Sequence, residues 1–391
     1  MATAASYKET VSSFQSLLAQ RTVAEFFAGI GLMRLGLEKE GWKVKFANDI
    51  DPSKYVMYLR HFGEKDGARF TVGDIHKLSA DAVPSVTLAT ASFPCNDLSL
   101  AGMRDGLGGK QSSAFWGFIR ILEEMGRRKP PIVLLENVAG FLSSHGGKDF
   151  QAAMLALNKL GYAVDALMID AERFVPQSRV RLFVIGTRDK KELSSAASDE
   201  SLFYGSDVRP AALAEYIFRH PEINWCMREM SNLPERTIGL TSILEDLPEA
   251  SDFWWSEDRV KYLISQMSSK HAKQLNALMK EHNWSYGTVF RRIRNARSMA
   301  ELRTDGIAGC LRTPRGGSGR QILIKAGYKK CQVRLLTPRE CARLMGADDY
   351  LVDVPLNQAL FGFGDAVCVP VIQWIAQNYL EPLIRGALED A

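Results

Sequence analysis

The first half of the chain alternates short apolar runs with helix-like segments, and this alternation restricts the fold more than any other feature. Strand-like runs lie at residues 22–27, 43–47, 86–92, 132–136 and 182–187, and helix-like segments at 33–40, 52–61, 113–125 and 150–160. Strands that alternate with helices of this length form a mostly parallel sheet, because each connection between parallel strands must cross one of its faces. The pattern therefore predicts an α/β fold.

The alternation stops near Arg188, and residues 190–332 are expected to be irregular. Regular structure is expected again after this region. A helix should begin at Thr337, which is followed by proline and, three residues on, by glutamate, the spacing of a capping box. We also expect a glycine-rich turn at residues 361–365 and a final helix at 369–379.

Composition indicates the compartment. The 391-residue chain is 46% hydrophobic and 24% charged, as ordinary globular proteins are. It has no apolar run of the roughly 20 residues that span a bilayer, and no cationic N-terminus that leads into an apolar stretch. Its six cysteines are scattered without CxxC spacing, which excludes a disulfide framework and a structural zinc site. We expect a soluble intracellular protein without a metal.

The first predicted strand runs into the turn Phe27–Gly31 (FAGIG), whose glycines let backbone N–H groups approach a nucleotide. The next strand ends at Asp49, eighteen residues beyond Gly31, where an acid can bind a ribose. A further strand region along the chain ends at Asp74, which is placed to meet a purine amino group. Because parallel strands end at one edge of a sheet, the three loops predict one nucleotide pocket.

Two cofactors fit this pocket. A nicotinamide dinucleotide would normally require a third glycine to seat its pyrophosphate, but Arg34 occupies that position. S-adenosylmethionine (AdoMet) has no phosphate and carries a positive sulfonium, so neutral or acidic loops suit it better. An NAD-dependent oxidoreductase remains the less favoured alternative.

Three further motifs carry the chemistry. Phe-Pro-Cys at 93–95 follows an apolar run, Glu-Asn-Val at 136–138 begins forty-one residues after the cysteine, and Gln-Ser-Arg-Val-Arg lies at 177–181. With FAGIG, the acids at 49 and 74, RLLTPREC at 334–341 and GFGDAVCVPVIQWI at 362–375, they resemble the DNA (cytosine-5)-methyltransferase family in the expected order. The resemblance covers about residues 22–188 and 334–377.

The resemblance implies a covalent mechanism. Carbon 5 of cytosine is too weak a nucleophile to attack a sulfonium, but addition of the Cys95 thiolate at carbon 6 activates it. Glu136 would bind the N3 and amino edge of the base and supply a proton at N3. Of Arg179 and Arg181, one would contact the base O2 and the other the backbone. The base must be flipped out of the duplex to be reached.

The resemblance also implies which residues bind the cofactor and the DNA. The expected cofactor-binding residues are Phe27, Ala28, Gly29, Ile30, Gly31, Asp49, Ile50, Asp74, Ile75, Pro94, Asp365 and Val367. The expected DNA-binding residues are Asn96, Ser99, Gln177, Arg312, Arg315 and Arg320. Residues 285–335 hold twelve Lys or Arg against two acids, and such a basic segment suits phosphates and guanine edges.

Some positions depart from the family's pattern. Ser92, Asn96 and Asp97 replace the usual glycine and Gln-Pro around the nucleophile, and Asp365 stands where an asparagine is common. The loop at residues 109–113 lacks the usual Asp-x-Arg-Gly. None of these changes touches the nucleophile or the glutamate, so we expect a divergent but active enzyme.

The sequence favours two other functions less. An RNA methyltransferase of the same fold would carry a Cys-Phe-Thr tripeptide, which is absent, and an inactive DNA-binding regulator would not need Cys95 and Glu136. We expect a monomer that acts on double-stranded DNA in the cytoplasm of a bacterial-type cell, with no membrane partner. A cognate restriction endonuclease acting separately would be its partner, unless the enzyme works alone.

The sequence thus predicts a Rossmann-like AdoMet-dependent methyltransferase sheet of α/β class with an inserted smaller target recognition domain. The expected domains are an N-terminal extension at 1–20, a catalytic AdoMet-binding domain at 21–189, the target recognition domain at 190–332, and a segment at 333–391 that completes the catalytic domain.

Overall fold

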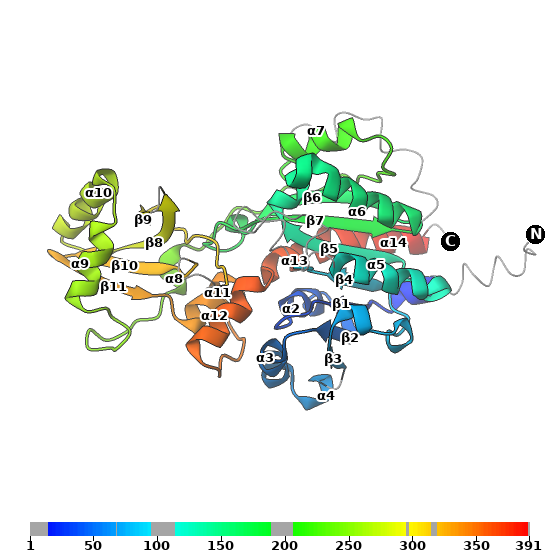
Figure 1. The fold of residues 1–391 in the computed structure, drawn as a ribbon, viewed down its shortest axis with the longest axis horizontal. Coiled ribbons are helices and arrows are strands. Elements are labelled where there is room, and N and C mark those ends of the chain that lie inside the picture. The colour runs from blue at the N-terminus through cyan, green and yellow to red at the C-terminus, as the bar shows by residue number, and fades with distance from the viewer. Residues whose placement is uncertain are drawn as a thin grey trace, which may run out of the picture. The chain divides into compact units, whose positions relative to one another are not determined.

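A computed structural model describes residues 15–67, 69–94, 114–188, 206–294, 297–313 and 319–389 (Figure 1). The chain divides into two compact units. The first unit consists of Met1–Ile169, Val180–Leu233 and Val371–Ala391, and the second unit of Asp170–Arg179 and Pro234–Pro370. Residues 190–233 and 333–370 are thus grouped differently from the predicted domains, whose functional boundaries stay a prediction.

The first unit is built on a seven-stranded sheet with strand order β3-β2-β1-β4-β5-β7-β6. The strands from β3 through β5 pair in parallel, and β7 pairs antiparallel with β5. The strands are β1 Thr22–Phe26, β2 Lys43–Asp49, β3 Phe70–Val72, β4 Leu88–Ala91, β5 Ile132–Val138, β6 Ala163–Asp170 and β7 Val180–Thr187. The prediction of a mostly parallel α/β sheet is confirmed, while β6 was not predicted.

Both faces of this sheet are buried. All residues of β1 and β4 are buried, as expected for parallel strands covered on two sides, and this explains their largely apolar sequences. One large core joins alternate residues of the strands to α5, α6 and α7. The helices of this unit are α2 Leu32–Glu38, α3 Pro52–Phe62, α4 Glu64–Gly67, α5 Ala114–Glu124, α6 Lys148–Lys159 and α7 Ala211–Arg219. Its C-terminal part holds most of α13 Val369–Ile375 and all of α14 Glu381–Glu389.

One stretch of C-terminal helices has the length and composition of a membrane span. It is Leu356–Glu389, whose length and hydropathy could cross a membrane. However, 72% of its most apolar window is buried inside the protein, as in a core helix. The predicted last helix at 369–379 continues as a π-helix at Ala376–Leu380.

The second unit contains a four-stranded sheet with strand order β11-β10-β8-β9, whose neighbours all pair antiparallel. Its strands are β8 Ser285–Arg294, β9 Arg297–Arg303, β10 Ile322–Gly327 and β11 Lys330–Leu335, and its helices are α8 Leu240–Ile243, α9 Glu257–Ser265, α10 Ser269–Lys280, α11 Pro338–Leu344 and α12 Leu356–Asp365. Apolar residues of α9 and α10 form a core with one face of the sheet.

Two expectations about this unit are wrong. The described part of residues 190–332 is not irregular, since in this unit it holds the helices α8 to α10, the strands β8 to β10 and the first residues of β11. Arginines interrupt the alternation of β8 near its end, which concealed the strand pattern. Residues 361–365 are not a turn but the end of α12. The glycine there is needed for a different reason, since a Cβ on Gly364 would lie 2.6 Å from the backbone of Arg312 and of Thr313.

The predicted start of α11 is confirmed with its capping box. The Thr337 hydroxyl accepts from the Glu340 N–H, and the Glu340 carboxylate accepts from the Thr337 N–H. Thr337 also donates to the Glu245 carboxylate, and Glu340 forms a buried ion pair with Arg334. The start of this helix is therefore the centre of a buried polar network.

Thr337→Ala should lower the free energy of unfolding by about 1 kcal/mol, because the mutation removes the cap acceptor. Urea unfolding followed by circular dichroism measures the change. Thr337→Ser is the control, because serine keeps the hydroxyl and should retain most of the stability. Equal losses in the two variants would contradict the capping role.

Candidate active site

The turn after β1 has a backbone that demands glycine. Phe27, Gly29 and Gly31 all have positive φ values of 57°, 57° and 83°. A Cβ on Gly31 would lie 2.9 Å from the Tyr58 ring and 2.5 Å from the Phe62 ring of α3. The turn is thus pressed against α3, where only glycine fits.

Side chains from β2 bind the neighbouring loops together. One Asp49 oxygen accepts from the Gly29 N–H at 2.9 Å, and the other accepts from the Asp51 N–H at 2.9 Å. The Asn48 amide donates to the carbonyls of Thr71 and Gly73 at 2.9 and 3.0 Å. The loops after β1, β2 and β3 are therefore joined at one edge of the sheet.

The remaining predicted cofactor residues of the first unit differ in accessibility. Ile50 is 67% exposed, immediately after Asp49. Asp74 accepts from the His76 N–H at 2.9 Å and so caps the short 3₁₀ turn that follows β3. Ile75 is only 4% exposed, and a Cβ on Gly117 of α5 would clash with it. Its side chain therefore belongs to the core.

Glu25 was not singled out in the sequence, although it is a lone carboxylate within the apolar strand β1. It is 1% exposed, and burial raises its pKa to about 8, while the positive charge of Arg34 acts in the opposite direction. A charged residue within an apolar run was the signal that could have identified it.

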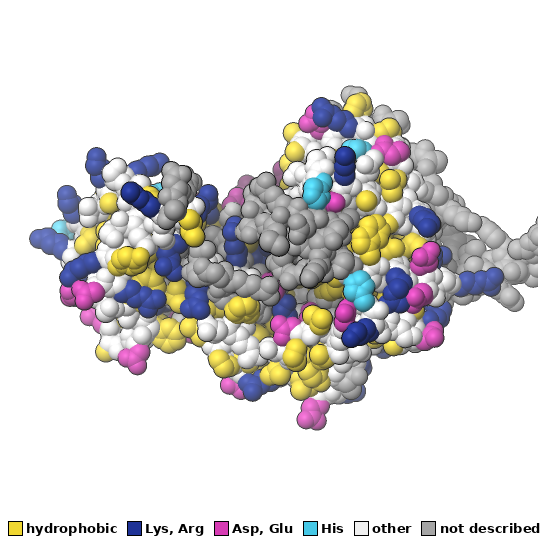
Figure 2. All heavy atoms as spheres, viewed as in Figure 1, with side chains coloured by type: hydrophobic (Ala, Val, Ile, Leu, Met, Phe, Trp, Pro, Cys, Tyr) yellow, Lys and Arg dark blue, Asp and Glu magenta, His cyan; other side chains and the backbone are white. Residues whose placement is uncertain are grey.

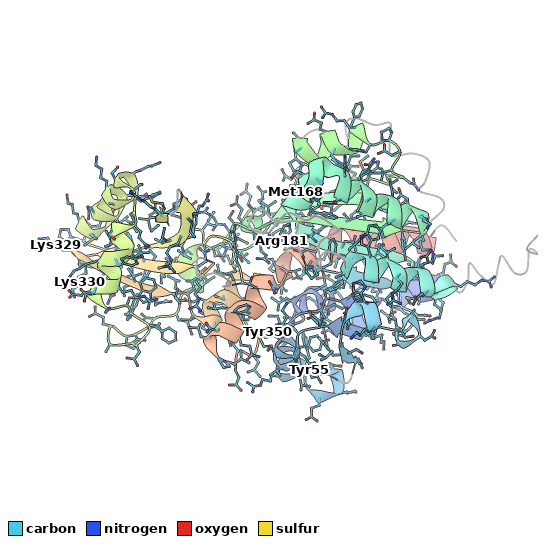
Figure 3. All side chains as sticks on the ribbon, viewed as in Figure 1. Tyr55, Met168, Arg181, Lys329, Lys330 and Tyr350 are labelled. Atoms are coloured by element: carbon cyan, nitrogen blue, oxygen red, sulfur yellow. The ribbon has the colours of Figure 1, made fainter. Side chains whose placement is uncertain are left out.

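The Glu136 carboxylate lies at the end of β5. It is 6% exposed and pairs with the Arg181 guanidinium, with 3.0 Å between Oε1 and Nε. Arg181 is labelled in Figure 3. The antiparallel register of β5 and β7 places Val138 opposite Arg181. Glu136 lies two residues before Val138 on the same face of β5, so its side chain reaches Arg181 on the adjacent strand. The structure thus brings two of the predicted catalytic residues into contact.

Asn137, beside this pair, holds the chain that leads to the predicted nucleophile. Its amide donates to the Phe93 carbonyl at 3.2 Å, and its own oxygen accepts from the Val138 N–H at 2.8 Å. Phe93 is buried among Phe115 and Phe141. The described chain continues to Pro94, while Cys95, Asn96, Asp97, Ser99 and Arg315 lie outside the described residues.

Gln177 and Arg179 belong to the second unit and are buried, with exposures of 0% and 3%. The Gln177 amide donates to the Leu344 carbonyl at 2.7 Å and accepts from the Leu311 N–H at 2.9 Å. Arg179 donates to the carbonyls of Leu311, Gly364 and Ala366. Their observed partners are all in the protein itself, and their predicted roles toward the base and the DNA stay predictions.

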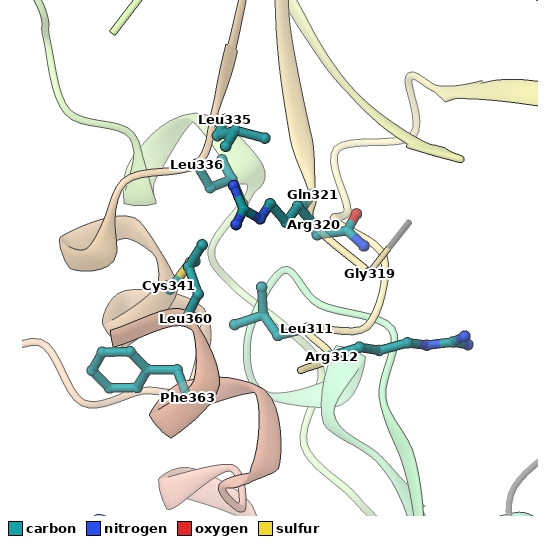
Figure 4. Close-up of a pocket in the computed structure, with 10 residues that line it drawn as sticks. All are labelled: Leu311, Arg312, Gly319, Arg320, Gln321, Leu335, Leu336, Cys341, Leu360 and Phe363. Atoms are coloured by element: carbon teal, nitrogen blue, oxygen red, sulfur yellow. The ribbon is translucent and has the colours of Figure 1, made fainter. Parts of the chain in front are cut away.

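Arg312 and Arg320 are placed beside a small pocket of the second unit (Figure 4). Arg312 is exposed, and Arg320 donates to Asn357 at 2.6 Å. Lys and Arg side chains are frequent over this unit on the face drawn in Figure 2. The pocket is lined by Leu311, Arg312, Gly319, Arg320, Gln321, Leu335, Leu336, Cys341, Leu360 and Phe363. It is mostly apolar, with the two arginines and Gln321 as its long polar side chains.

The fold and the site define a class of protein. A mostly parallel sheet has glycine and acidic loops joined at one edge, and a carboxylate–guanidinium pair stands at the end of a further strand. This is the arrangement of a Rossmann-like methyltransferase, in which a nucleotide-like cofactor binds at the carboxyl ends of the strands. Among the described residues, no cluster of three or more potential metal ligands occurs.

The model of the C-5 cytosine-specific DNA methylase family matches residues 21–381. The chain belongs to this family and is thus a DNA cytosine-5 methyltransferase. The resemblance found in the sequence motifs, and the fold class it implied, are confirmed.

Individual relatives agree. The Type II methyltransferase M.DsaV of Dactylococcopsis salina is 31% identical over 360 residues, 91% of this chain and 85% of that relative. The Type II methyltransferase M.HhaI of Haemophilus parahaemolyticus is 27% identical over 358 residues, 90% and 92% of the two chains. The solved structure of the Entamoeba histolytica methyltransferase EhMeth has a TM-score of 0.63 at 16% identity, and the match covers 93% of this chain and 98% of that chain. This last likeness shows the fold alone.

Gly31→Ala should destabilise the protein more than Gly41→Ala. Both glycines have similar φ values, 83° and 78°, but a Cβ on Gly41 meets nothing within 4 Å. Gly41→Ala should cost about 1–2 kcal/mol for the left-handed backbone alone. Gly31→Ala should cost about 1–3 kcal/mol more, because its methyl group collides with two rings.

Thermal and urea unfolding of the two variants, measured side by side, give this difference. Equal destabilisation would show that the turn is not pressed against α3 in the way described.

Proposed function

We propose that this enzyme transfers a methyl group from AdoMet to carbon 5 of a flipped-out cytosine in a specific double-stranded DNA sequence, through a covalent bond between Cys95 and carbon 6. One observation carries the proposal. The end of β5 presents Glu136 paired with Arg181, and the next residue, Asn137, holds the carbonyl of Phe93, two residues before Cys95.

The joined loops of the first unit suit AdoMet. Asp49 has its carboxylate at the rim of the glycine turn, where it can accept from ribose hydroxyls in addition to the Gly29 N–H. Ile50 offers an exposed apolar surface for a purine face, and Asp74 is placed to accept from a purine amino group. Phe27, Ala28, Ile30, Gly31, Ile75 and Pro94 complete the proposed site through the backbone and packing of these loops. Asp365 and Val367, which belong to the second unit, are proposed as cofactor-binding residues from the family resemblance.

When bound, AdoMet supplies an electrophilic methyl group. Cys95, as the thiolate, adds to carbon 6 of the cytosine, and the ring electrons move so that carbon 5 becomes nucleophilic. Glu136 binds the N3 and amino edge of the base and holds the proton at N3 during this step. Arg181 orients the Glu136 carboxylate and contacts the base oxygen. After the transfer, the proton on carbon 5 leaves to water and the Cys95 bond breaks.

The DNA is proposed to meet the second unit. The basic segment at residues 285–335 supplies phosphate contacts, except for Arg334, which is buried in its ion pair with Glu340. Arg312, Arg315 and Arg320 are the proposed base or phosphate contacts nearest the family's recognition signature. Asn96 and Ser99 would contact the DNA beside the nucleophile. Residues 190–332 act as the target recognition domain in this proposal, and Gln177 supports it from a buried position.

The setting follows from the relatives. Relatives named Type II methyltransferases favour a role in a restriction-modification system, with a cognate endonuclease that acts separately on the same DNA sequence. We propose that the enzyme acts as a monomer in the cytoplasm.

The covalent step can be trapped. The enzyme, incubated with AdoMet and a duplex library of random sequence that contains 5-fluorocytosine, should form a complex that survives denaturing electrophoresis. The fluorine at carbon 5 cannot leave as the proton does, and so it blocks the elimination that normally releases the cysteine. Cys95→Ser should form no such complex.

Cys331→Ser is the matched control. Cys331 is half-buried on β11, and burial raises the pKa of its thiol to about 11, so it is a poor nucleophile at neutral pH. This variant should trap DNA as the unmodified enzyme does. A complex that persists in Cys95→Ser, or that is lost in Cys331→Ser, would contradict the assignment.

A further inference from the structure

Arg179 has a different role from that of Arg181. We propose that Arg179 is a positioning residue that locks the segment at residues 310–312 to the segment at 364–366, and so couples DNA engagement to AdoMet binding. The inference rests on the proposed function, because it uses the DNA and cofactor roles given above to the residues of these segments.

The contacts of Arg179 join the two segments directly. Its Nη1 donates to the Leu311 carbonyl at 2.8 Å and to the Cys310 sulfur at 3.3 Å. Its Nη2 donates to the carbonyls of Gly364 and Ala366. One rigid guanidinium therefore holds main-chain oxygens from two parts of the chain that are more than fifty residues apart in sequence.

Burial makes these bonds important. Arg179 is 3% exposed, and a guanidinium removed from water is stable only when carbonyl or charged acceptors replace the lost water. Lysine cannot reproduce the fork, because its ammonium is a single point that cannot reach two separate acceptors in the same geometry. The observed arrangement requires arginine, and both terminal nitrogens are used in it.

The same two segments also touch through their backbones. A Cβ on Gly364 would lie 2.6 Å from the carbonyl carbon of Arg312 and 2.6 Å from the nitrogen of Thr313, so only glycine permits this approach. Gln177, two residues before Arg179, accepts from the Leu311 N–H and donates to the Leu344 carbonyl. The three side-chain and backbone contacts leave little independent movement to either segment.

The functional consequence follows from what each segment carries. The first ends at Arg312, which is exposed and proposed to contact DNA. The second contains Asp365 and precedes Val367, both proposed to contact AdoMet. Because the segments are locked together, a ligand that orders one also favours the bound geometry of the other. This is a coupling free energy between two sites, and it acts in both directions.

The experiment measures that coupling. The affinity of the cofactor product S-adenosylhomocysteine is determined by calorimetry, with and without a duplex that carries the sequence methylated by the enzyme. In the unmodified enzyme the duplex should tighten binding by about 5-fold or more, within the usual range of allosteric coupling. Arg179→Met should bring this factor to below about 2-fold, since the shared lock is gone.

Arg343→Met is the matched control. Arg343, on α11 of the same unit, also donates to a main-chain carbonyl, that of Ile243 at 3.1 Å, and Ile243 belongs to neither segment. Its coupling factor should equal that of the unmodified enzyme. With cofactor and DNA saturating, the rate of covalent trapping in Arg179→Met should fall by less than about 10-fold, because a positioning residue does not touch the base.

Three outcomes would overturn the inference. They are an unchanged coupling factor in Arg179→Met, a saturated trapping rate reduced about 100-fold or more with coupling intact, or an unmodified enzyme that traps DNA without any coupling. Failure of the unmodified enzyme to trap DNA would instead remove the proposed function, and with it this role.

Arg179→Lys is a second variant for the case that Arg179→Met fails to fold. Lysine keeps the positive charge but cannot make the forked contacts of the guanidinium. In this variant, amide hydrogen exchange should rise together in residues 308–312 and 364–369. Exchange that rises in only one of the two segments, or in neither, would show that Arg179 does not lock them, whatever the activity.

Discussion

The ion pair between Glu136 and Arg181 is the interaction on which the proposed chemistry depends. A carboxylate that is 6% exposed needs a counter-charge, and the guanidinium lies 3.0 Å away. The pair exists because β7 runs antiparallel to β5, which places Arg181 beside the end of β5. If β7 ran parallel to β5, its last residues would lie beside the end of β5, and Arg181, near its start, would lie at the opposite edge of the sheet. The reversed direction of β7 thus places the guanidinium beside the acid at the end of β5.

At the cofactor edge of the sheet, polar side chains likewise hold neighbouring loops in place through bonds to their backbone. Asp49 and Asn48 use their side chains on the loops beside them, so three loops that belong to different strands behave as one surface. Asp49 keeps the turn at Gly29 in place before any ligand binds, and the exposed Ile50 stands next to it. Preorganisation of this kind reduces the entropy lost when a ligand is ordered.

Local sequence signals predicted much of this molecule, and their failures have physical causes. Most strands of the first sheet are visible in the sequence, because strands such as β1 and β4 are buried on both faces, although β6 is not visible there. The helix at Thr337 is visible because its capping box is local in sequence. The sheet of the second unit is not visible, because arginines interrupt the alternation of β8 near its end and because β8 pairs with β10, which is distant along the chain. Residues 361–365 were taken as a turn, since glycine usually marks one. The glycine is there for the close approach of another backbone, which no local pattern reveals.

The candidate site shows the same limit. The motif around Gln177, Arg179 and Arg181 was visible in the sequence, but its spacing alone gave the two arginines similar roles. The structure separates them, because Arg181 pairs with Glu136 while Arg179 contacts main-chain carbonyls in the second unit. The contacts of each side chain, rather than the motif, distinguish a group near the chemistry from one that supports it.

Bisulfite sequencing of DNA from cells that express the chain tests the central claim most directly. We expect full methylation of one cytosine within a single short sequence, and no methylation of that cytosine in cells that express Cys95→Ser at the same level. Unmethylated DNA in both, or equal methylation in both, would contradict it.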